Sequence, residues 1–295
     1  AASTDDVVGG HRRQNACHAL HTIMQHHAPA AADVAAADGS VTTLLDVATA
    51  GRVGARSQAC WALADLMQAV PTAAAAVAGA GGAAALLAVA REGSADGRQN
   101  ACAALRVLME QDEASAADVS AAHGAAALLD VATTGTQTAI GVACWTLGVL
   151  LAKHAAPAPQ VAADDGVAKL LAVVREGDKL GRQNACYALH MLMSRHEASA
   201  AAVVASGGVD DILDVAAHSA LPARSQACWA IAELVERLPA AAAGVVAADG
   251  VATLLSVARE GDADGQQNAC FALRVLVEAH EPSAALIAAA DGVRA

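Results

Sequence analysis

Cysteine is the most regularly spaced reactive residue type in this chain of 295 residues, and thiols can act as nucleophiles, metal ligands or disulfide partners. The first interval between consecutive cysteines is 43 residues, and each of the next five is 42. The seven positions are Cys17, Cys60, Cys102, Cys144, Cys186, Cys228 and Cys270. So constant a period is typical of one supersecondary unit repeated along the chain, and it predicts a solenoid.

The same spacing indicates what the thiols do. Equivalent positions on stacked helices lie about 8–10 Å apart, beyond the roughly 7 Å Cα separation that a disulfide allows. We therefore predict seven buried, reduced thiols that pack as small apolar groups. Reduced thiols favour a cytoplasmic location, with the nucleus as the alternative.

Histidines and carboxylates do not form a recognisable catalytic or metal-binding pattern. Four histidines cluster between His18 and His27, but a metal site needs more ligands and a supporting shell. The run that starts at Asp262 begins like a calcium loop, but its twelfth position is Leu273 instead of glutamate. The sequence therefore predicts a protein that is not an enzyme, with no metal and no other cofactor.

Aromatic and cationic side chains alternate along the repeat. All three tryptophans directly follow a cysteine, in every second unit, at Trp61, Trp145 and Trp229. The other units carry His18, Ala103, Tyr187 or Phe271 at this position, and His21, Arg106, His190 or Arg274 three residues further on. Tryptophan units have only alanine or glycine there. We expect a surface of alternating aromatic and cationic or imidazole positions; the other interpretation is that each indole needs a small neighbour to lie flat.

Acidic residues accompany two of the tryptophans. Asp65 and Glu233 each follow a tryptophan by four residues. A carboxylate and a ring face together can hold a lysine or arginine side chain. We expect these two positions to bind a basic residue of a partner.

An amide stands two residues before the cysteine in six units, at Asn15, Gln58, Asn100, Asn184, Gln226 and Asn268. An amide both donates and accepts hydrogen bonds. The row could therefore bind the backbone of an added strand, or it could join adjacent repeats. We favour the second role.

The unit around Trp145 departs from this pattern. It has Val142 at the amide position, Val149 at the acidic position, and Ile140 where other units have arginine, as at Arg56, Arg98, Arg182 and Arg224. We hypothesise that these residues form an exposed apolar patch with Trp145, a candidate hot spot for binding. The alternative is that the sequence of this unit has drifted without a functional reason, or that flanking segments cover it.

Composition and charge narrow the class of partner. The chain has 18 Lys and Arg against 30 Asp and Glu, a net charge of −12. Nucleic-acid binding depends on cations that neutralise phosphates, so we exclude it. The electrostatic field of this negative charge favours a basic protein or peptide as the partner.

The stretch 70–90 carries no charged residue and has the composition of a membrane span, but it contains Pro71 and a glycine cluster. We therefore predict a helix, a hinge and a second helix in this stretch, and no membrane partner.

Three helical segments recur in each unit. A short Ala/Val segment, such as 199–206, is followed by glycine, which tolerates the left-handed conformation that ends a helix. A Leu-rich segment follows, such as 167–174, and then a longer helix that carries the cysteine, such as 182–195. Asp96 and Asp264 are candidate N-terminal caps of the third helix.

The glycine after the first helix and the Ala-Cys-x-Ala-Leu run of the third, as in Ala185–Leu189, resemble the armadillo repeat over the whole chain. The resemblance implies an all-α fold, a right-handed armadillo-type α-solenoid of three-helix repeats. We expect one array over 1–295, with partial repeats at 1–27 and 281–295. The complete repeats are expected at 28–70, 71–112, 113–154, 155–196, 197–238 and 239–280. Neither end has a polar capping face, so we expect a segment of a longer array.

The resemblance also implies a function. Armadillo arrays bind partners in a concave groove lined by the third helices, so we expect a non-catalytic scaffold that binds an extended or helical peptide segment. Import adaptors of the importin-alpha type carry an asparagine four residues after the tryptophan, and that ladder is absent here. A basic-peptide carrier of that type and a spacer array within a larger protein are the alternatives. The expected groove residues are Trp61, Asp65, Arg106, Ile140, Val142, Trp145, Val149, Tyr187, His190, Trp229, Glu233, Phe271 and Arg274.

Overall fold

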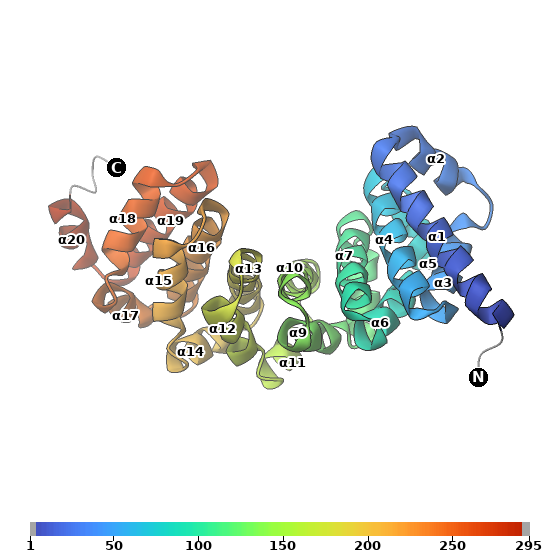
Figure 1. Cartoon of the computed structure of the whole chain (residues 1–295). Coiled ribbons are helices and arrows are strands. Elements are labelled where there is room, and N and C mark those ends of the chain that lie inside the picture. Colours follow the sequence, from blue (N-terminus) through green and yellow to red (C-terminus); the bar gives the residue numbers. More distant parts are fainter. Residues whose placement is uncertain (1–3, 291–295) are drawn as a thin grey trace. The chain divides into compact units, whose positions relative to one another are not determined.

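The computed structural model describes residues 4–290, with side chains for 11–27 and 29–290, and this part of the chain is helical throughout (Figure 1). Its helices fall into three classes that recur in order. The third helices are α1 Thr4–His26, α4 Val53–Ala69, α7 Ala95–Gln111, α10 Gln137–Lys153, α13 Lys179–Arg195, α16 Leu221–Arg237 and α19 Ala263–Ala279. The second helices are α3 Ser40–Ala50, α6 Gly82–Glu92, α9 Gly124–Thr134, α12 Gly166–Glu176, α15 Gly208–His218 and α18 Gly250–Glu260. The first helices are α2 Ala28–Ala36, α5 Ala73–Gly79, α8 Ala114–Ala121, α11 Ala158–Ala163, α14 Ala198–Ala205, α17 Ala241–Ala247 and α20 Ser283–Ala289.

Four of the described third helices, α7, α10, α13 and α19, begin at a side-chain cap. The capping residue lies directly before the helix, and its oxygen accepts a hydrogen bond from the backbone N–H three residues on; these caps are Ser94, Thr136, Asp178 and Asp262. The expectation that Asp96 and Asp264 are the caps is wrong. Both lie inside the first turn, where their charge still favours the positive end of the helix dipole.

The turn between the first and second helices needs one residue with left-handed backbone angles. Gly207 supplies it at φ 72°, as expected. At two Asp-Gly pairs, however, the aspartate takes this conformation, Asp165 at φ 58° and Asp249 at φ 61°. The following Gly166 is required for a different reason, because a Cβ there would lie 2.4 Å from the carbonyl oxygen of Val161.

The 43-residue first interval has a local structural origin. The left-handed Gly39 lies five positions after Val34 in the sequence, whereas the equivalent Gly81 of the next repeat lies four positions after Val77. The extra residue lengthens the exit from α2, whose capping residue Ala37 is extended at ψ 125°. The one extra residue of the first interval therefore lies in this turn, and it does not change the register of the helices on either side.

The buried stripe of the third helix agrees with its sequence pattern. In α7, Ala101, Cys102, Leu105, Leu108 and Met109 are all fully buried. Neighbouring third helices pack on one another: α1, α4, α7 and α10 in succession, and likewise α13, α16 and α19. Helices α3, α6, α12 and α15 each pack on the third helix of their own repeat and on the first and second helices of the next, so that α3 contacts α4, α5 and α6, and α15 contacts α16, α17 and α18. The core therefore runs between consecutive repeats.

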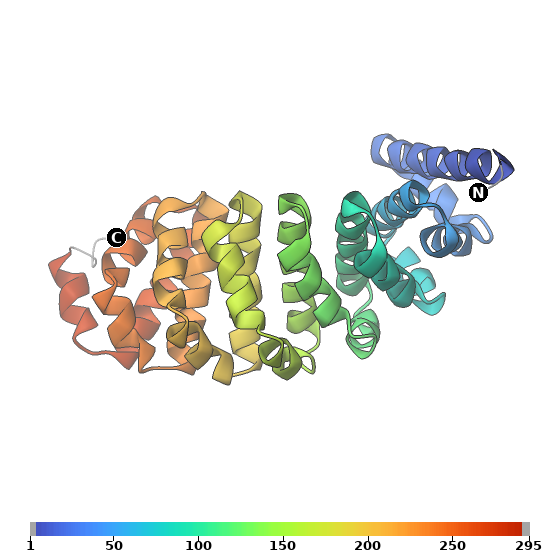
Figure 2. The same cartoon turned by 60° about the horizontal axis from the view of Figure 1, so that its bottom comes forward.

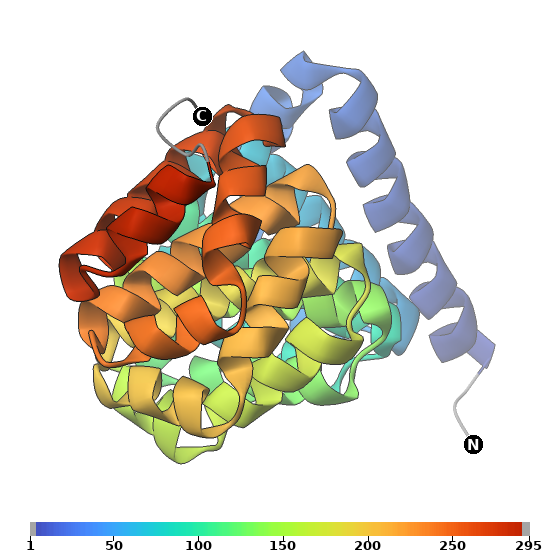
Figure 3. The same cartoon turned by 90° about the vertical axis from the view of Figure 1, so that its left-hand side faces the viewer.

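Contacts divide the chain into two compact units, Ala1–His154 and Ala155–Ala295. The division falls at a boundary expected between two repeats. It comes directly after α10, the third helix that carries Ile140 in place of arginine. The single array over 1–295 stays a prediction. Figure 2 shows α1 as the outermost helix of the first unit, and Figure 3 shows α18–α20 at the near end of the second.

In the described part of the chain, no single helix is both long enough and apolar enough to cross a membrane. Two pairs of consecutive helices reach the required length and composition together. They are α5 with α6, which cover most of the uncharged stretch noted above and end at Glu92, and α17 with α18. The pairs are bent by 78° and 77°.

Candidate partner-binding surface

Each tryptophan is stacked against a side chain from the preceding third helix. The guanidinium carbon of Arg106 in α7 lies 4.1 Å from the ring centroid of Trp145 in α10. In the same way, the ring centroids of His21 and Trp61 are 3.7 Å apart. The expected alternation is therefore a set of pairs, in which a cation or imidazole of one repeat covers part of the indole of the next.

The third pair lies in the second unit. The ring of His190 in α13 stacks on Trp229 in α16, with centroids 4.1 Å apart. Arg274 in α19 has no described third helix after it, and it lies instead over Phe271 of its own helix, 4.8 Å from the ring centroid. It also pairs with Glu278 at 2.6 Å.

Two of the three indoles remain open to solvent. Trp61 is 37% and Trp145 38% exposed, and they are the only aromatic residues among the exposed large apolar side chains of the described residues. Trp229 and Tyr187 are half-buried. The first unit therefore presents two ring surfaces at equivalent positions of α4 and α10.

Asp65 is already paired within the chain. Its carboxylate is hydrogen-bonded to Nδ1 of His21, the residue stacked on Trp61. Burial raises the pKa of the Asp65 carboxyl, an effect that the hydrogen bond from His21 partly offsets. The expected role of Asp65 as an open ligand for a partner's lysine or arginine is not supported, because His21 occupies it.

Glu233 is not part of an open surface. Its side chain is 6% exposed, one oxygen accepts from Nε of Arg237 at 2.7 Å, and the other lies 3.8 Å from Nδ1 of His190. His190 is itself only 3% exposed, and burial lowers its pKa to about 4. Its Nδ1 has no hydrogen-bond partner. Glu233 and His190 were expected to line the groove. That expectation is wrong, because they lie between α13 and α16.

The apolar unit around Trp145 is smaller than expected. Val149 is 6% exposed and belongs to the core, which corrects its place in an exposed patch. Ile140 and Val142 are half-buried, and Arg106 covers part of the indole. The accessible apolar surface here is mainly the remaining area of Trp145.

Two amides join adjacent repeats, the role that we favoured. Nδ2 of Asn100 donates to the backbone carbonyl of Ser57 at 3.2 Å and to its hydroxyl at 3.1 Å. Asn268 makes the same pair of bonds with Ser225, at 3.4 and 3.0 Å. These asparagines therefore fasten α7 to α4 and α19 to α16.

A second set of hydrogen bonds between helices was not predicted from the sequence. Four residues before the cysteine, an arginine donates from Nε to a carbonyl near the end of the second helix of its own repeat. The bonds are Arg56 to Ala48 at 3.1 Å, Arg98 to Ala90 at 3.1 Å and Arg224 to Ala216 at 2.9 Å. The recurrent arginine was the available signal, but only the fold shows which carbonyl it meets.

Six cysteines are buried, as expected, but Cys270 is exposed, and the prediction of seven buried thiols is wrong there. Cys270 lies on α19, and within the described residues no third helix comes after α19 (Figure 3). Burial raises the pKa of Cys60, Cys102, Cys186 and Cys228 to about 12. Such thiols are poor nucleophiles. No group of three or more His, Cys, Asp or Glu side chains in the described ranges is arranged to hold a metal ion.

No family model matches the sequence, and no curated protein matches it. Solved structures do match the fold. An engineered protein superposes with a TM-score of 0.74 at 20% identity, covering 81% of this chain and 97% of its own. A designed armadillo repeat protein gives 0.69 at 14% identity, covering 80% and 99%. A second designed armadillo repeat protein, in complex with the peptide (KR)4, gives 0.67 at 13% identity, with the same coverage.

The chain thus has the armadillo-like helical-repeat fold, an all-α solenoid, which confirms the fold expected from its sequence. At these identities the likeness concerns the fold alone.

Proposed function

We propose that this chain is a non-catalytic scaffold that binds an extended peptide segment of a partner across its third helices. The observation that carries the proposal is the pair of exposed indoles, Trp61 and Trp145, at equivalent positions two repeats apart in one unit. Exposed aromatic rings are enriched among residues that dominate binding energy.

The spacing of the rings suits an extended chain. Third helices pack at about 8–10 Å, so the two rings are separated by roughly 20 Å. An extended peptide covers about 3.3 Å per residue, so about six residues would bridge them. A designed armadillo protein of similar fold is described in complex with a peptide, which supports a peptide as the class of ligand.

We propose a basic segment as the ligand, on two grounds. The net charge is −12, and the peptide of the designed neighbour is (KR)4. Contacts would come from the ring faces of Trp61 and Trp145 through cation–π attraction, because Asp65 and Glu233 are paired internally. We also propose a cytoplasmic location, which the free thiols favour.

Fluorescence anisotropy of labelled octapeptides tests the proposal. One peptide alternates lysine and arginine, and the other alternates glutamate and serine. We expect saturable binding of the basic peptide, weakened by salt, and a loss of about 30-fold for each of Trp61→Ala and Trp145→Ala. Val204→Ala, at an exposed apolar residue of α14, is the matched control and should bind like wild type.

Thermal unfolding of each variant separates lost binding from lost fold. Trp145→Phe retains a ring and should recover most of the affinity. Preference for the acidic peptide would contradict the basic ligand but keep the peptide-binding surface. Equal affinities in all variants, or no binding of either peptide, would contradict the proposed surface and favour a spacer.

A further inference from the structure

The two exposed indoles of the first unit are equally open to solvent but lie in different electrostatic surroundings. Trp61 is 37% and Trp145 38% exposed, and both belong to third helices of the same unit. In each case a side chain from the preceding third helix lies against the ring. The two rings are therefore a matched pair of binding positions that differ in the group covering them.

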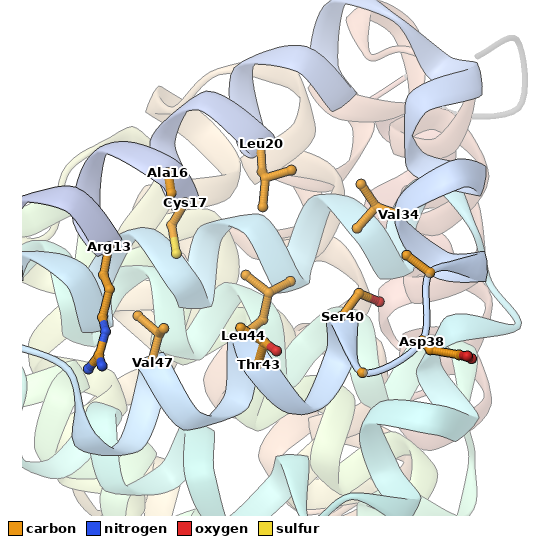
Figure 4. A pocket seen from close by; sticks show the side chains of 12 residues that line it. Arg13, Ala16, Cys17, Leu20, Val34, Asp38, Ser40, Thr43, Leu44 and Val47 are labelled. Carbon is orange, nitrogen blue, oxygen red and sulfur yellow. The ribbon is translucent and has the colours of Figure 1, made fainter.

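The group that lies against Trp61 is an imidazole bound to a carboxylate. Figure 4 shows Cys17 and Leu20 of α1 directed toward α3, where they line a pocket of about 350 Å³. His21 lies on the side of the same helix that faces α4, with its ring centroid 3.7 Å from that of Trp61. Its Nδ1 is hydrogen-bonded to Asp65. With Asp65 ionised, the pair carries either no net charge or one negative charge, whichever form the imidazole takes.

The group that lies against Trp145 is a permanent cation. The guanidinium carbon of Arg106 lies 4.1 Å from the ring centroid, and a guanidinium keeps its charge throughout the neutral pH range. Helix α10 supplies no carboxylate near the ring, because the position equivalent to Asp65 is the buried Val149. The one acidic partner of Arg106 is Glu110 of its own helix, at 2.5 Å. The ring of Trp145 is thus already engaged by a positive charge.

These surroundings favour different ligand groups at the two rings. An aromatic ring attracts a cation, but a second cation at the same ring is repelled by the first. A basic side chain of a partner is therefore favoured at Trp61 and is opposed by Arg106 at Trp145. An apolar side chain meets no such repulsion, and Val142, half-buried and three residues before Trp145, adds apolar surface on the same face of α10.

We propose that Trp61 binds a basic side chain of the peptide ligand and that Trp145 binds an apolar side chain about six residues away in the same peptide. This inference rests on the proposed peptide-binding surface and assigns a register to its ligand. A basic side chain can still stack on Trp145, as in a wholly basic peptide, but less favourably than an apolar one. Asp65 and Arg106 determine the difference through their charges, and Asp65 does so without contacting the ligand.

Three labelled nonapeptides of serine, with anchor residues at their second and eighth positions, test this preference. The two anchors are both lysine, lysine and leucine, or both leucine. Anisotropy is measured against the whole chain at pH 8, above the ordinary pKa of an imidazole. We expect the lysine–leucine peptide to bind at least fivefold more tightly than either of the others. The order of the anchors does not affect the comparison, because an extended peptide can bind in either direction.

Variants that remove one charge identify the responsible groups. Arg106→Gln should raise the affinity of the two-lysine peptide to about that of the lysine–leucine peptide, because the repelling charge is lost. Asp65→Asn keeps an acceptor for His21, and it should weaken the lysine–leucine peptide at least threefold without changing the two-leucine peptide. Asp118→Asn and Arg52→Gln, at exposed residues of the same unit, change the net charge equally and should leave the affinity ratios unchanged.

The outcomes separate this preference from the peptide-binding surface itself. Affinity ratios measured on one preparation do not depend on the fraction of protein that is folded. Equal binding of the three nonapeptides, or a ratio of two-lysine to lysine–leucine affinity that Arg106→Gln leaves unchanged, would overturn the preference, while binding of the lysine–arginine octapeptide would still support the surface. Failure of the octapeptide and of all three nonapeptides to bind would overturn both.

Discussion

Arg106 of α7 and Trp145 of α10 are joined across a repeat boundary, with the guanidinium carbon 4.1 Å from the indole centroid. His21 with Trp61 and His190 with Trp229 repeat the relationship. The 84-residue spacing of the tryptophans results from it, because each pair needs one repeat for the cation or imidazole and one for the ring. The pairs also orient the indoles that we assign to partner binding.

Removal of the Arg106 side chain should weaken the stack of α7 on α10. We expect Arg106→Ala to lower the free energy of unfolding by about 1 kcal/mol and to change the tryptophan fluorescence. Arg274→Ala is the matched control, because Arg274 also pairs with a glutamate four residues on but stacks on a ring of its own helix. Equal losses in the two variants, measured by urea unfolding, would show that the cross-repeat stack contributes nothing.

Acidification should destabilise the second unit through His190. Burial lowers the pKa of His190 from 6.5 to about 4, so the unfolded chain binds the proton more readily than the folded chain. The stabilisation is complete above pH 6.5 and is lost as pH falls toward 4, on the order of 3 kcal/mol.

The comparison of wild type with His190→Phe measures this contribution. Urea unfolding between pH 7 and pH 4 should show a smaller decline in the variant, because no imidazole titrates at that position. The neighbouring Glu233 and Arg237 are unchanged in both proteins. Parallel pH profiles would contradict the assignment.

Cys270 should be the only thiol that reacts readily in the folded chain. It is exposed, while the other six cysteines are buried. Limited alkylation with iodoacetamide at pH 8, followed by peptide mass mapping, should label Cys270 at least tenfold faster than Cys60 or Cys102. Urea should make all seven react. Comparable labelling of Cys102 before unfolding would show that the third helices separate readily.

The asparagine links should contribute to stability. Asn100→Ala and Asn268→Ala each remove two hydrogen bonds to the preceding third helix, and we expect losses of about 1–2 kcal/mol. Asn15→Ala alters the equivalent but exposed residue of α1 and should be neutral. Calorimetric melting of the three variants tests the difference. Similar melting temperatures for all three would instead assign the amide row to partner binding.

The period, the three helix classes and the buried stripe of α7 could be predicted from the sequence because they depend on local patterning of apolar residues and glycine. The exposure of Trp61 and Trp145 on the third helices could be inferred from their register beside the cysteine. The sequence left two interpretations of Asn100 open, partner binding or a link between adjacent repeats. Only the position of Ser57 decided in favour of the link.

The errors share a physical cause. Burial of Glu233, His190 and Val149 depends on how two neighbouring helices pack, which the pattern of one helix does not specify. Exposure of Cys270 likewise depends on the packing of its helix, α19, against a neighbour.

Affinity capture on the immobilised whole chain, compared between wild type and the Trp61→Ala/Trp145→Ala double variant by quantitative mass spectrometry, tests the central claim most directly. Val204→Ala serves as the control, and each protein is first shown to unfold at the same temperature as wild type. The account predicts a protein that wild type and Val204→Ala retain equally and that the double variant loses at least tenfold. Equal retention by all three proteins would contradict a binding surface centred on the two exposed indoles.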